Sequence, residues 1–340
     1  MSLRILTVSP TPFYATAGGE FFTRQILSLL RPSATLVICP GDHQWNEPNT
    51  FHLNTENVCE AQLLKESQRF SPELVIIVNY NRLSFLRLGV ALARSLSPRF
   101  FFIPLFHGLE YQVAQIQLTR ALIAYLNRKA DLVIFNSPAE RDKFHRQIGP
   151  TNLEIIRPPQ VSKISSQQRI KHQNGIFLSL GQNRKRKRLD YLMREHNDFR
   201  YKNDIPLVIA GPYTKQLQIP GGEASIKIVG QVSEDQKEEL WTHTLAHLSI
   251  SMHEAFSMVT LEALYRGKLA LLHSSAGILT FGPPRNVVIT FSDDSEIQKK
   301  FDFLYEQRAL GRELAPQLVN WLKAVDDLRG AADSQIANLV

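Results

Sequence analysis

The chain has 340 residues, of which 44% are hydrophobic and 21% charged, enough for two ordinary globular domains with real cores. No apolar run approaches the roughly 18 residues of a transmembrane helix, and the N-terminus predicts a first strand rather than a signal peptide. The two cysteines, Cys39 and Cys59, have no metal-ligand spacing, which argues against a disulfide framework or a zinc site. We therefore expect a protein of a reducing, cytoplasmic compartment.

The formal net charge of +7 is unevenly distributed. Residues 1–170 hold 18 Lys and Arg against 12 Asp and Glu, or +6, whereas residues 171–340 hold 21 against 20, or +1. A basic first half would suit a peripheral contact with the inner membrane face, or an acidic acceptor. Solubility alone explains so modest an excess equally well.

Apolar runs that alternate with helical patterns predict an α/β protein made of two Rossmann-like, doubly wound domains. The first set of runs covers residues 3–8, 34–39, 74–78, 101–105, 132–135 and 153–156. The second set covers residues 176–180, 207–210, 226–229, 248–251, 269–272 and 287–290. Pro158-Pro159 and the polar stretch 162–168 form the best linker, so we place the domains at 1–160 and 161–315. Two such domains would face a ligand cleft at the carboxyl ends of their strands.

Two features after strands of the first domain are weak signals of a site. Gly18-Gly19 opens a helix after the first strand and permits a close backbone approach to a ligand. The pair lacks the G-x-G-x-x-G spacing of dinucleotide sites, and a plain turn explains it as well. His107 follows the run 101–105 beside Gly108, where a structural loop histidine is as good an interpretation as an active-site one.

Five consecutive basic residues, 184–188, follow the first strand of the second domain. They repel one another, so they are either solvated or meet an anion. No aromatic residues are interleaved with them and the second domain is nearly neutral, which argues against nucleic acid as the partner.

The segment His253–Leu264 carries Glu254 and Glu262 with seven residues between them. It follows the strand-like run 246–251 and precedes Gly267-Lys268 and another apolar run, which predicts strand, loop, helix and strand. A helix beginning near Ser257 would offer its free N–H groups to an anion and hold the two carboxylates roughly 10 Å apart. Spacing alone also allows a solvated Glu262 and a simple loop Glu254.

This segment resembles the Glu-x7-Glu signature of the retaining glycosyltransferase family 4, among the glycosyl transferases group 1, which have the GT-B fold. Here it is E-A-F-S-M-V-T-L-E-A-L-Y-R-G-K-L-A, with Ala255 in place of the usual Gly and Leu269 in place of the usual Pro. The basic loop resembles the family's G-R-x4-K-G-x-D, in which Arg and Lys hold the nucleotide diphosphate. Lys187 and Asp190 match that pattern.

The basic loop also departs from the family. Gln182 occupies the Arg position and Arg188 the Gly position. Arg184 or Lys185 would then have to supply the missing charge.

The resemblance extends to other strand ends and implies roles for them. Gly18-Gly19 would lie near the donor phosphates, His107 beside the donor sugar, and Glu110 on the acceptor side. Two further segments would contact the nucleotide, namely 229–233 and 207–212, the second of which includes Gly211. Ser137, in a match to A-D-x-V-I-x-x-S, would close the cleft, and Asp131 would be structural. The family's later G-G-x-x-E has no counterpart here, because 275–280 contains no Glu.

The resemblance implies transfer of a sugar from a nucleoside-diphosphate sugar to an acceptor hydroxyl, with retention and without a metal or other cofactor. Glu254 would bind the donor sugar, Glu262 the ribose, and Lys187 the leaving diphosphate. Donor-binding residues would be Gly18, Gly19, Arg184, Lys187, Gly211, Ser257, Met258, Val259 and Glu262. The acceptor would be a glycan, a lipid or a small molecule, and nucleic acid is not expected.

The resemblance also implies that residues 316–340, whose apolar residues have helical spacing, cross back to the first domain. Two alternatives to the transferase stay open. One is a nucleotide-sugar epimerase of the GT-B type. The other is a degenerate nucleotide-sugar-binding protein, which Gln182 and the missing late Glu would favour.

Overall fold

The computed structural model describes residues 3–10, 18–41, 49–78, 82–96, 98–106, 109, 115–161, 175–252, 254–307 and 316–340. By their internal contacts, Met1–Gln160 with Asp326–Val340 form one compact unit (unit 1), and Val161–Val325 form another (unit 2). The sequence predicts domain boundaries after residues 160 and 315. The expected linker, 162–168, lies outside the described residues.

Unit 1 contains a parallel sheet in the order β3-β2-β1-β4-β5-β6-β7. Its strands are β1 (Arg4–Val8), β2 (Ala34–Cys39), β3 (Thr50–Asn54), β4 (Leu74–Val78), β5 (Arg99–Ile103), β6 (Leu132–Phe135) and β7 (Glu154–Ile156). Its own helices are α1 (Gly18–Leu30), α2 (Glu60–Phe70), α3 (Leu83–Ser95), α4 (Ile116–Lys129) and α5 (Pro138–Gln147).

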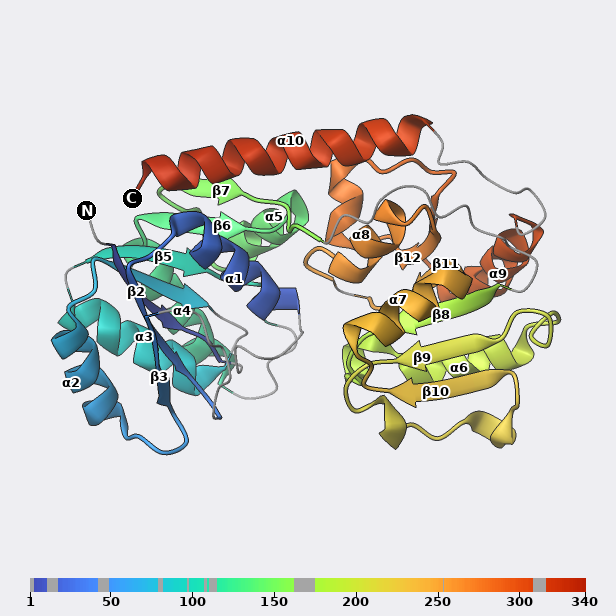
Figure 1. Cartoon of the computed structure of the whole chain (residues 1–340), viewed down its shortest axis with the longest axis horizontal. Coiled ribbons are helices and arrows are strands. Elements are labelled where there is room, and N and C mark those ends of the chain that lie inside the picture. The colour runs from blue at the N-terminus through green and yellow to red at the C-terminus, as the bar shows by residue number, and fades with distance from the viewer. Residues whose placement is uncertain are drawn as a thin grey trace. The chain divides into compact units, whose positions relative to one another are not determined.

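Successive side chains of the central strands in unit 1 enter opposite cores, so both faces of the sheet are buried there. Leu6, Val75 and Phe102 pack with side chains of α2 to α5, whereas Ile5, Ile76 and Phe101 pack with α1. Figure 1 shows these helices on the two sides of the sheet. The continuous apolar runs of the sequence follow from this double burial.

Unit 2 contains a second parallel sheet in the order β10-β9-β8-β11-β12-β13. Its strands are β8 (Ile176–Leu180), β9 (Leu207–Ala210), β10 (Ile226–Gly230), β11 (Thr244–Ser249), β12 (Leu269–His273) and β13 (Val288–Phe291). Its helices include α6 (Leu189–Asp198), α7 (Glu234–His243), α8 (Met258–Tyr265) and α9 (Ile297–Glu306). The short 3₁₀ helices are η2 (Lys185–Lys187), η3 (Thr214–Gln216), η4 (Pro220–Gly222), η5 (Gly277–Phe281) and η6 (Asp294–Glu296). The expected pair of doubly wound sheets is confirmed.

The structure differs from the sequence prediction at three strands. β3 was not expected, since Thr50, His52 and Asn54 interrupt its apolar residues; as an edge strand it has only β2 as a neighbour. β11 begins at Thr244, four residues earlier than the run 248–251 suggested, because its first residues are also buried. β5 covers Arg99–Ile103 rather than 101–105.

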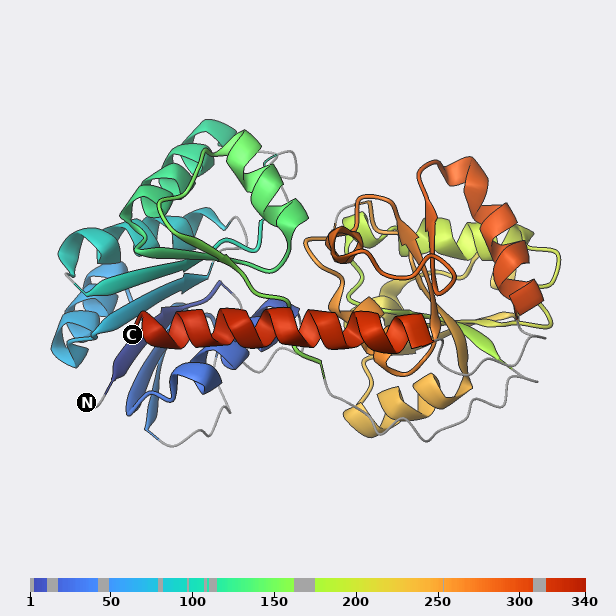
Figure 2. The same cartoon turned by 90° about the horizontal axis from the view of Figure 1, so that it is seen from above.

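Helix α10 (Pro316–Asn338) is one unbroken helix that starts in unit 2 and ends in unit 1 (Figure 2). Within unit 2, Leu318, Leu322 and Val325 belong to the main core, and the Trp321 indole N–H donates to the Phe281 carbonyl at 2.7 Å. None of the described helices is both long and apolar enough to cross a membrane.

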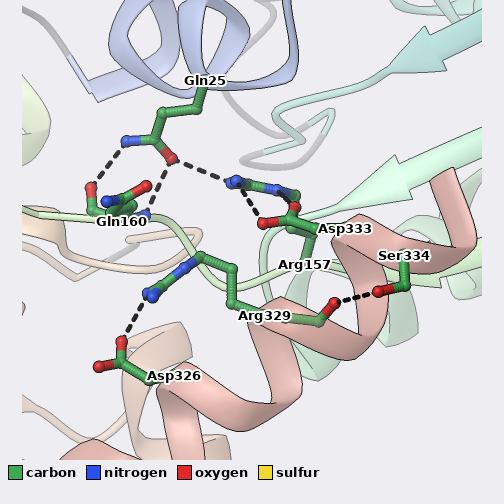
Figure 3. Close-up of polar contacts among 8 residues, drawn as sticks. Gln25, Arg157, Gln160, Asp326, Arg329, Asp333 and Ser334 are labelled. Carbon is green, nitrogen blue, oxygen red and sulfur yellow. Dashed lines mark hydrogen bonds and ion pairs between the residues drawn. The ribbon is translucent and has the colours of Figure 1, made fainter. Parts of the chain in front are cut away.

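Within unit 1, the last part of α10 is anchored by a buried arginine. Ala332 and Ile336 pack into the core shared by α1 and the sheet, and the Arg157 guanidinium donates to the Asp333 carboxylate (Figure 3). Arg157 also donates to Gln25 Oε1 at 3.0 Å, and that same oxygen accepts from the Gln160 backbone at 2.9 Å. Side chains from α1, the strand-end segment after β7 and α10 therefore meet at one point.

Candidate functional site

The described candidate residues of unit 2 gather where the strand order of its sheet reverses. β8 and β11 are adjacent, but the chain leaves them toward β9 on one side and β12 on the other. At such a point the loops after the two strands diverge and leave room for a ligand at their carboxyl ends. The basic loop follows β8, and the segment holding Glu254 follows β11.

Glycines lie at the ends of three neighbouring strands, where the backbones come close together: Gly181 follows β8, Gly211 follows β9, and Gly230 is the last residue of β10. Gly211 has φ +134°, and a Cβ atom there would overlap the carbonyl group of Gly181. Gly230 has φ +87°, and a Cβ there would lie 2.6 Å from Cε of Lys215, whose side chain covers it. Only glycine fits these two positions, which explains the Gly211 that the sequence had singled out.

Lys187 and Glu254 form an ion pair across the ends of β8 and β11. Arg186 reaches the other oxygen of the same carboxylate at 3.3 Å. The Glu254 side chain is only 9% exposed and those of the two cations 19% each, so the cluster is shielded from water on most sides. The Lys187 side chain also packs against Gly181, with Cε 3.7 Å from the position of a Cβ there.

The pKa of Lys187 is lowered from its ordinary value, chiefly by burial. Glu254 opposes that shift through charge and hydrogen bonding, while Arg186 and Arg184 repel the ammonium and lower its pKa further. Beneath the pair, burial lowers the pKa of His247 to about 4. His247 Nδ1 lies 3.1 Å from the Leu178 carbonyl oxygen, so this neutral imidazole is a structural residue of β11.

Helix α8 begins as the sequence predicted, with Ser257 at its N-cap in a left-handed conformation of φ +87°. The Ser257 hydroxyl lies 2.7 Å from that of Thr260. Met258 and Val259 occupy the first two helical positions, whose N–H groups have no partner inside the helix. This end of α8 can therefore offer backbone donors and a positive dipole to an anion.

Glu262 lies in α8 with its carboxylate 3.5 Å from the Lys237 ammonium of α7. Its side chain is 18% exposed, and burial raises the pKa of the carboxyl although Lys237 and Arg266 oppose the shift. A carboxylate that is held near one lysine and is largely withdrawn from water is suited to accept hydrogen bonds from ligand hydroxyls.

The loop after β12 supports the Glu254 segment through its backbone. Gly277 N–H donates to the Glu254 carbonyl and Ile278 N–H to that of Phe256, each at 2.9 Å. The Phe256 and Phe281 rings meet edge to face at 5.6 Å. The family's later G-G-x-x-E has no counterpart here; the contacts to the Glu254 loop come from η5.

The structure brings Lys187 and Glu254 together, while Glu262 pairs with a different lysine. Gly18 and Gly19 open α1 in unit 1, and Arg184 precedes η2. His107 and Glu110 lie outside the described residues.

Ser137 and Asp131 both have structural roles in unit 1. Ser137 is the N-cap of α5 and accepts from Glu140 N–H at 3.1 Å. Asp131 accepts from Phe100 N–H at 2.7 Å, which joins β5 to the start of β6.

Sequence reasoning missed Glu140, Lys215 and Lys237. Glu140 is buried in α5, and its carboxylate accepts from Phe106 N–H at 2.5 Å and from Asn136 N–H at 2.8 Å. Burial raises the pKa of this carboxyl to about 7. The signal in the sequence is an acid three residues after a serine, a pattern typical of a capping box at a helix N-terminus.

No cluster of three or more His, Cys, Asp or Glu side chains that could hold a metal occurs among the described residues. Lys187 and Arg186 are the cations that the structure places against Glu254 at this edge of the sheet.

The comparison with curated proteins gave no match for this chain. Solved structures match it over nearly its whole length. Sucrose-phosphate synthase from Thermosynechococcus elongatus has a TM-score of 0.76 at 15% identity, covering 99% of this chain and 98% of that one. Anabaena Alr3699/HepE in complex with UDP and glucose has a TM-score of 0.77 at 16% identity, covering 99% of each chain.

A third match is the α,α-trehalose 6-phosphate synthase from Burkholderia multivorans, with a TM-score of 0.69 at 11% identity, covering 100% of this chain and 97% of that one. At such identities the likeness establishes the fold. Residues 160–319 also match the family model described as "Glycosyl transferases group 1". The chain therefore has the GT-B fold, and the part that carries the Lys187–Glu254 cluster matches the group 1 glycosyltransferases.

Proposed function

We propose that the protein is a retaining glycosyltransferase that moves a sugar from a nucleoside-diphosphate sugar to an acceptor hydroxyl. The observation that carries the proposal is the cluster of Lys187, Arg186 and Glu254 at the switch point of the unit 2 sheet. The family match over residues 160–319 supports a transferase, and the HepE structure with UDP-glucose makes UDP the first nucleotide to test.

The donor diphosphate would bind where the strand-end glycines, the N-terminus of α8 and the basic loop converge. Lys187, with Arg184 and Arg186 beside it, would neutralise the charge that develops on the departing diphosphate. Such a site needs no metal, since protein cations and backbone N–H groups fill that role. By resemblance to the family, Gly18 and Gly19 would lie near the donor phosphates.

Glu262 would accept hydrogen bonds from the ribose hydroxyls and Glu254 from those of the donor sugar. His107 would line the reacting centre. The bond from the anomeric carbon to the diphosphate oxygen breaks, the acceptor oxygen bonds to the same face, and its proton passes to the departing phosphate. We expect this front-face route because no described residue is an evident covalent nucleophile.

The proposal is tested by replacing the ribose-binding carboxylate. Glu262→Ala should abolish UDP-glucose binding in calorimetry, because one buried acceptor and its charge are removed together. Circular dichroism should show an unchanged fold. The matched control is Glu239→Ala, an exposed glutamate of the neighbouring helix α7, which should bind as the parent does. Unchanged affinity of Glu262→Ala for a panel of UDP-, GDP- and ADP-sugars that the parent binds would overturn the assignment.

Product analysis separates the remaining alternatives. Transfer to an acceptor supports the transferase, whereas conversion of the donor sugar without an acceptor would identify an epimerase. Donor binding with only slow hydrolysis on every acceptor would identify a degenerate binding protein.

A further inference from the structure

A second concave site lies in unit 2, on the side of the sheet edge formed by β13. It is a groove of about 840 Å³, within the range of about 300–1,000 Å³ usual for small-molecule sites. Its walls come from η5 and the segment after it, from β13 and from α9. Neither the Lys187–Glu254 cluster nor α8 contributes to its described lining, so the proposed donor site does not account for it.

Three cations line the groove: Arg285, Lys299 and Lys300. Of these, Lys300 has an ion pair with Glu296 at 3.6 Å, between side chains that are 31% and 39% exposed. Because this ion pair is solvent-exposed and its N–O distance is long, it constrains Lys300 only weakly. No carboxylate appears among the described lining residues, so the groove has a net positive lining.

The other described lining residues are mostly apolar. Val288 and Ile289 belong to the buried core beneath the groove, whereas Leu279 is only partly buried and Phe303 of α9 is a large hydrophobic side chain that stays 38% exposed. A hydrocarbon chain would cover the Phe303 ring and the accessible part of Leu279, whereas a lone phosphate would leave that apolar surface in water.

We propose that this groove binds an anionic amphiphile, with its phosphate or carboxylate head on Arg285, Lys299 and Lys300 and its hydrocarbon part against Leu279 and Phe303. Cations and hydrocarbon surface within one groove match the two ends of such a molecule. The proposal is independent of the sugar transfer, because the groove shares none of its described lining residues with the proposed donor contacts.

Decyl phosphate, below its micelle concentration, is the probe, and isothermal calorimetry on the full chain is the measurement. We expect saturable binding of decyl phosphate, no binding of neutral decyl maltoside, and much weaker binding of inorganic phosphate. Lys299→Ala and Arg285→Ala should each weaken decyl phosphate binding on the order of tenfold, the loss of one charge-assisted contact. Phe303→Ser should weaken decyl phosphate but leave the weak phosphate binding unchanged.

The matched control is Lys227→Ala, which removes an exposed lysine from β10, the opposite edge strand of the same sheet. It should bind decyl phosphate as the parent does. Equal affinity in all four variants would overturn the proposal, because binding would then be unspecific. Inorganic phosphate binding as tightly as decyl phosphate would also overturn it, because the site would then be a plain anion site. Since UDP is absent from these titrations, failure here leaves the glycosyltransferase proposal standing.

Discussion

At the scale of single residues, Lys187 and Glu254 form an ion pair in a largely buried position, where either charge alone would be unfavourable. Burial disfavours the ammonium, and the carboxylate restores part of its stability. A buried ion pair gains little overall, but removing one partner leaves the other charge uncompensated. The proposed diphosphate would add to the negative charge that Lys187 receives from Glu254.

This coupling predicts a shift in the pH dependence of donor binding. Glu254→Gln removes the interaction that raises the Lys187 pKa and leaves burial and the neighbouring arginines, which lower it. Lys187 should then lose its proton at a lower pH than in the parent. Calorimetric titration of UDP from neutral to alkaline pH should show affinity declining earlier in the variant, while Glu239→Gln keeps the parent profile. Superimposable profiles for Glu254→Gln and the parent would show that Lys187 does not sense Glu254.

At the scale of elements, the turn between η2 and α6 holds the basic loop in place. Arg188 has φ +54° at the N-cap of α6, a conformation that costs an ordinary residue about 1 kcal/mol. Its guanidinium donates to Asp294 at 2.9 Å and lies 4.4 Å from the centre of the Tyr191 ring. These contacts offset the backbone strain and explain how arginine stands where the resembled family has glycine.

Two substitutions separate the backbone strain at residue 188 from the side-chain contacts that offset it. Arg188→Ala loses the contacts and keeps the strain, so it should lower the free energy of unfolding by about 1–2 kcal/mol. Arg188→Gly loses the same contacts but removes the strain, so it should be about 1 kcal/mol more stable than the alanine variant. Urea denaturation of both variants measures the difference, and an alanine variant as stable as the glycine variant would rule out strain at this turn.

Strands that are buried on both faces were predictable from the sequence. Strands that form mainly by pairing with an adjacent strand were not. The runs at β4 and β9 are fully buried and apolar, so composition alone marked them as strands. β3 depends on pairing with β2, which no local pattern reveals. In the same way Glu254 and Lys187 were found through loop motifs, whereas Lys237 approaches Glu262 only because α7 and α8 lie close together.

At the scale of the whole molecule, the chain returns to its first unit through α10. The last part of α10 is held in unit 1 by a buried arginine as well as by hydrophobic packing. Arg157 is only 2% exposed, and burial lowers its pKa while Asp333 opposes the shift. The sequence periodicity predicted the helix, but nothing local predicted that Asp333 would meet a residue 176 positions away.

Breaking the Arg157–Asp333 contact should destabilise the end of α10 more than breaking an exposed ion pair would. Arg157→Met leaves Asp333 without its guanidinium and Gln25 without one donor, so unit 1 should lose about 3 kcal/mol of stability. Hydrogen exchange of peptides from β7 and from residues 326–338 should report the loss directly.

Two further variants complete the test of the Arg157–Asp333 contact. Arg157→Met combined with Asp333→Leu should recover most of the stability, since no buried charge then stays unpaired. Arg69→Ala, which removes a 63% exposed partner of Glu66 in the same unit, should change stability by less than about 1 kcal/mol. If Arg157→Met exchanges no faster than Arg69→Ala, hydrophobic contacts such as those of Ile336 hold the helix without the arginine.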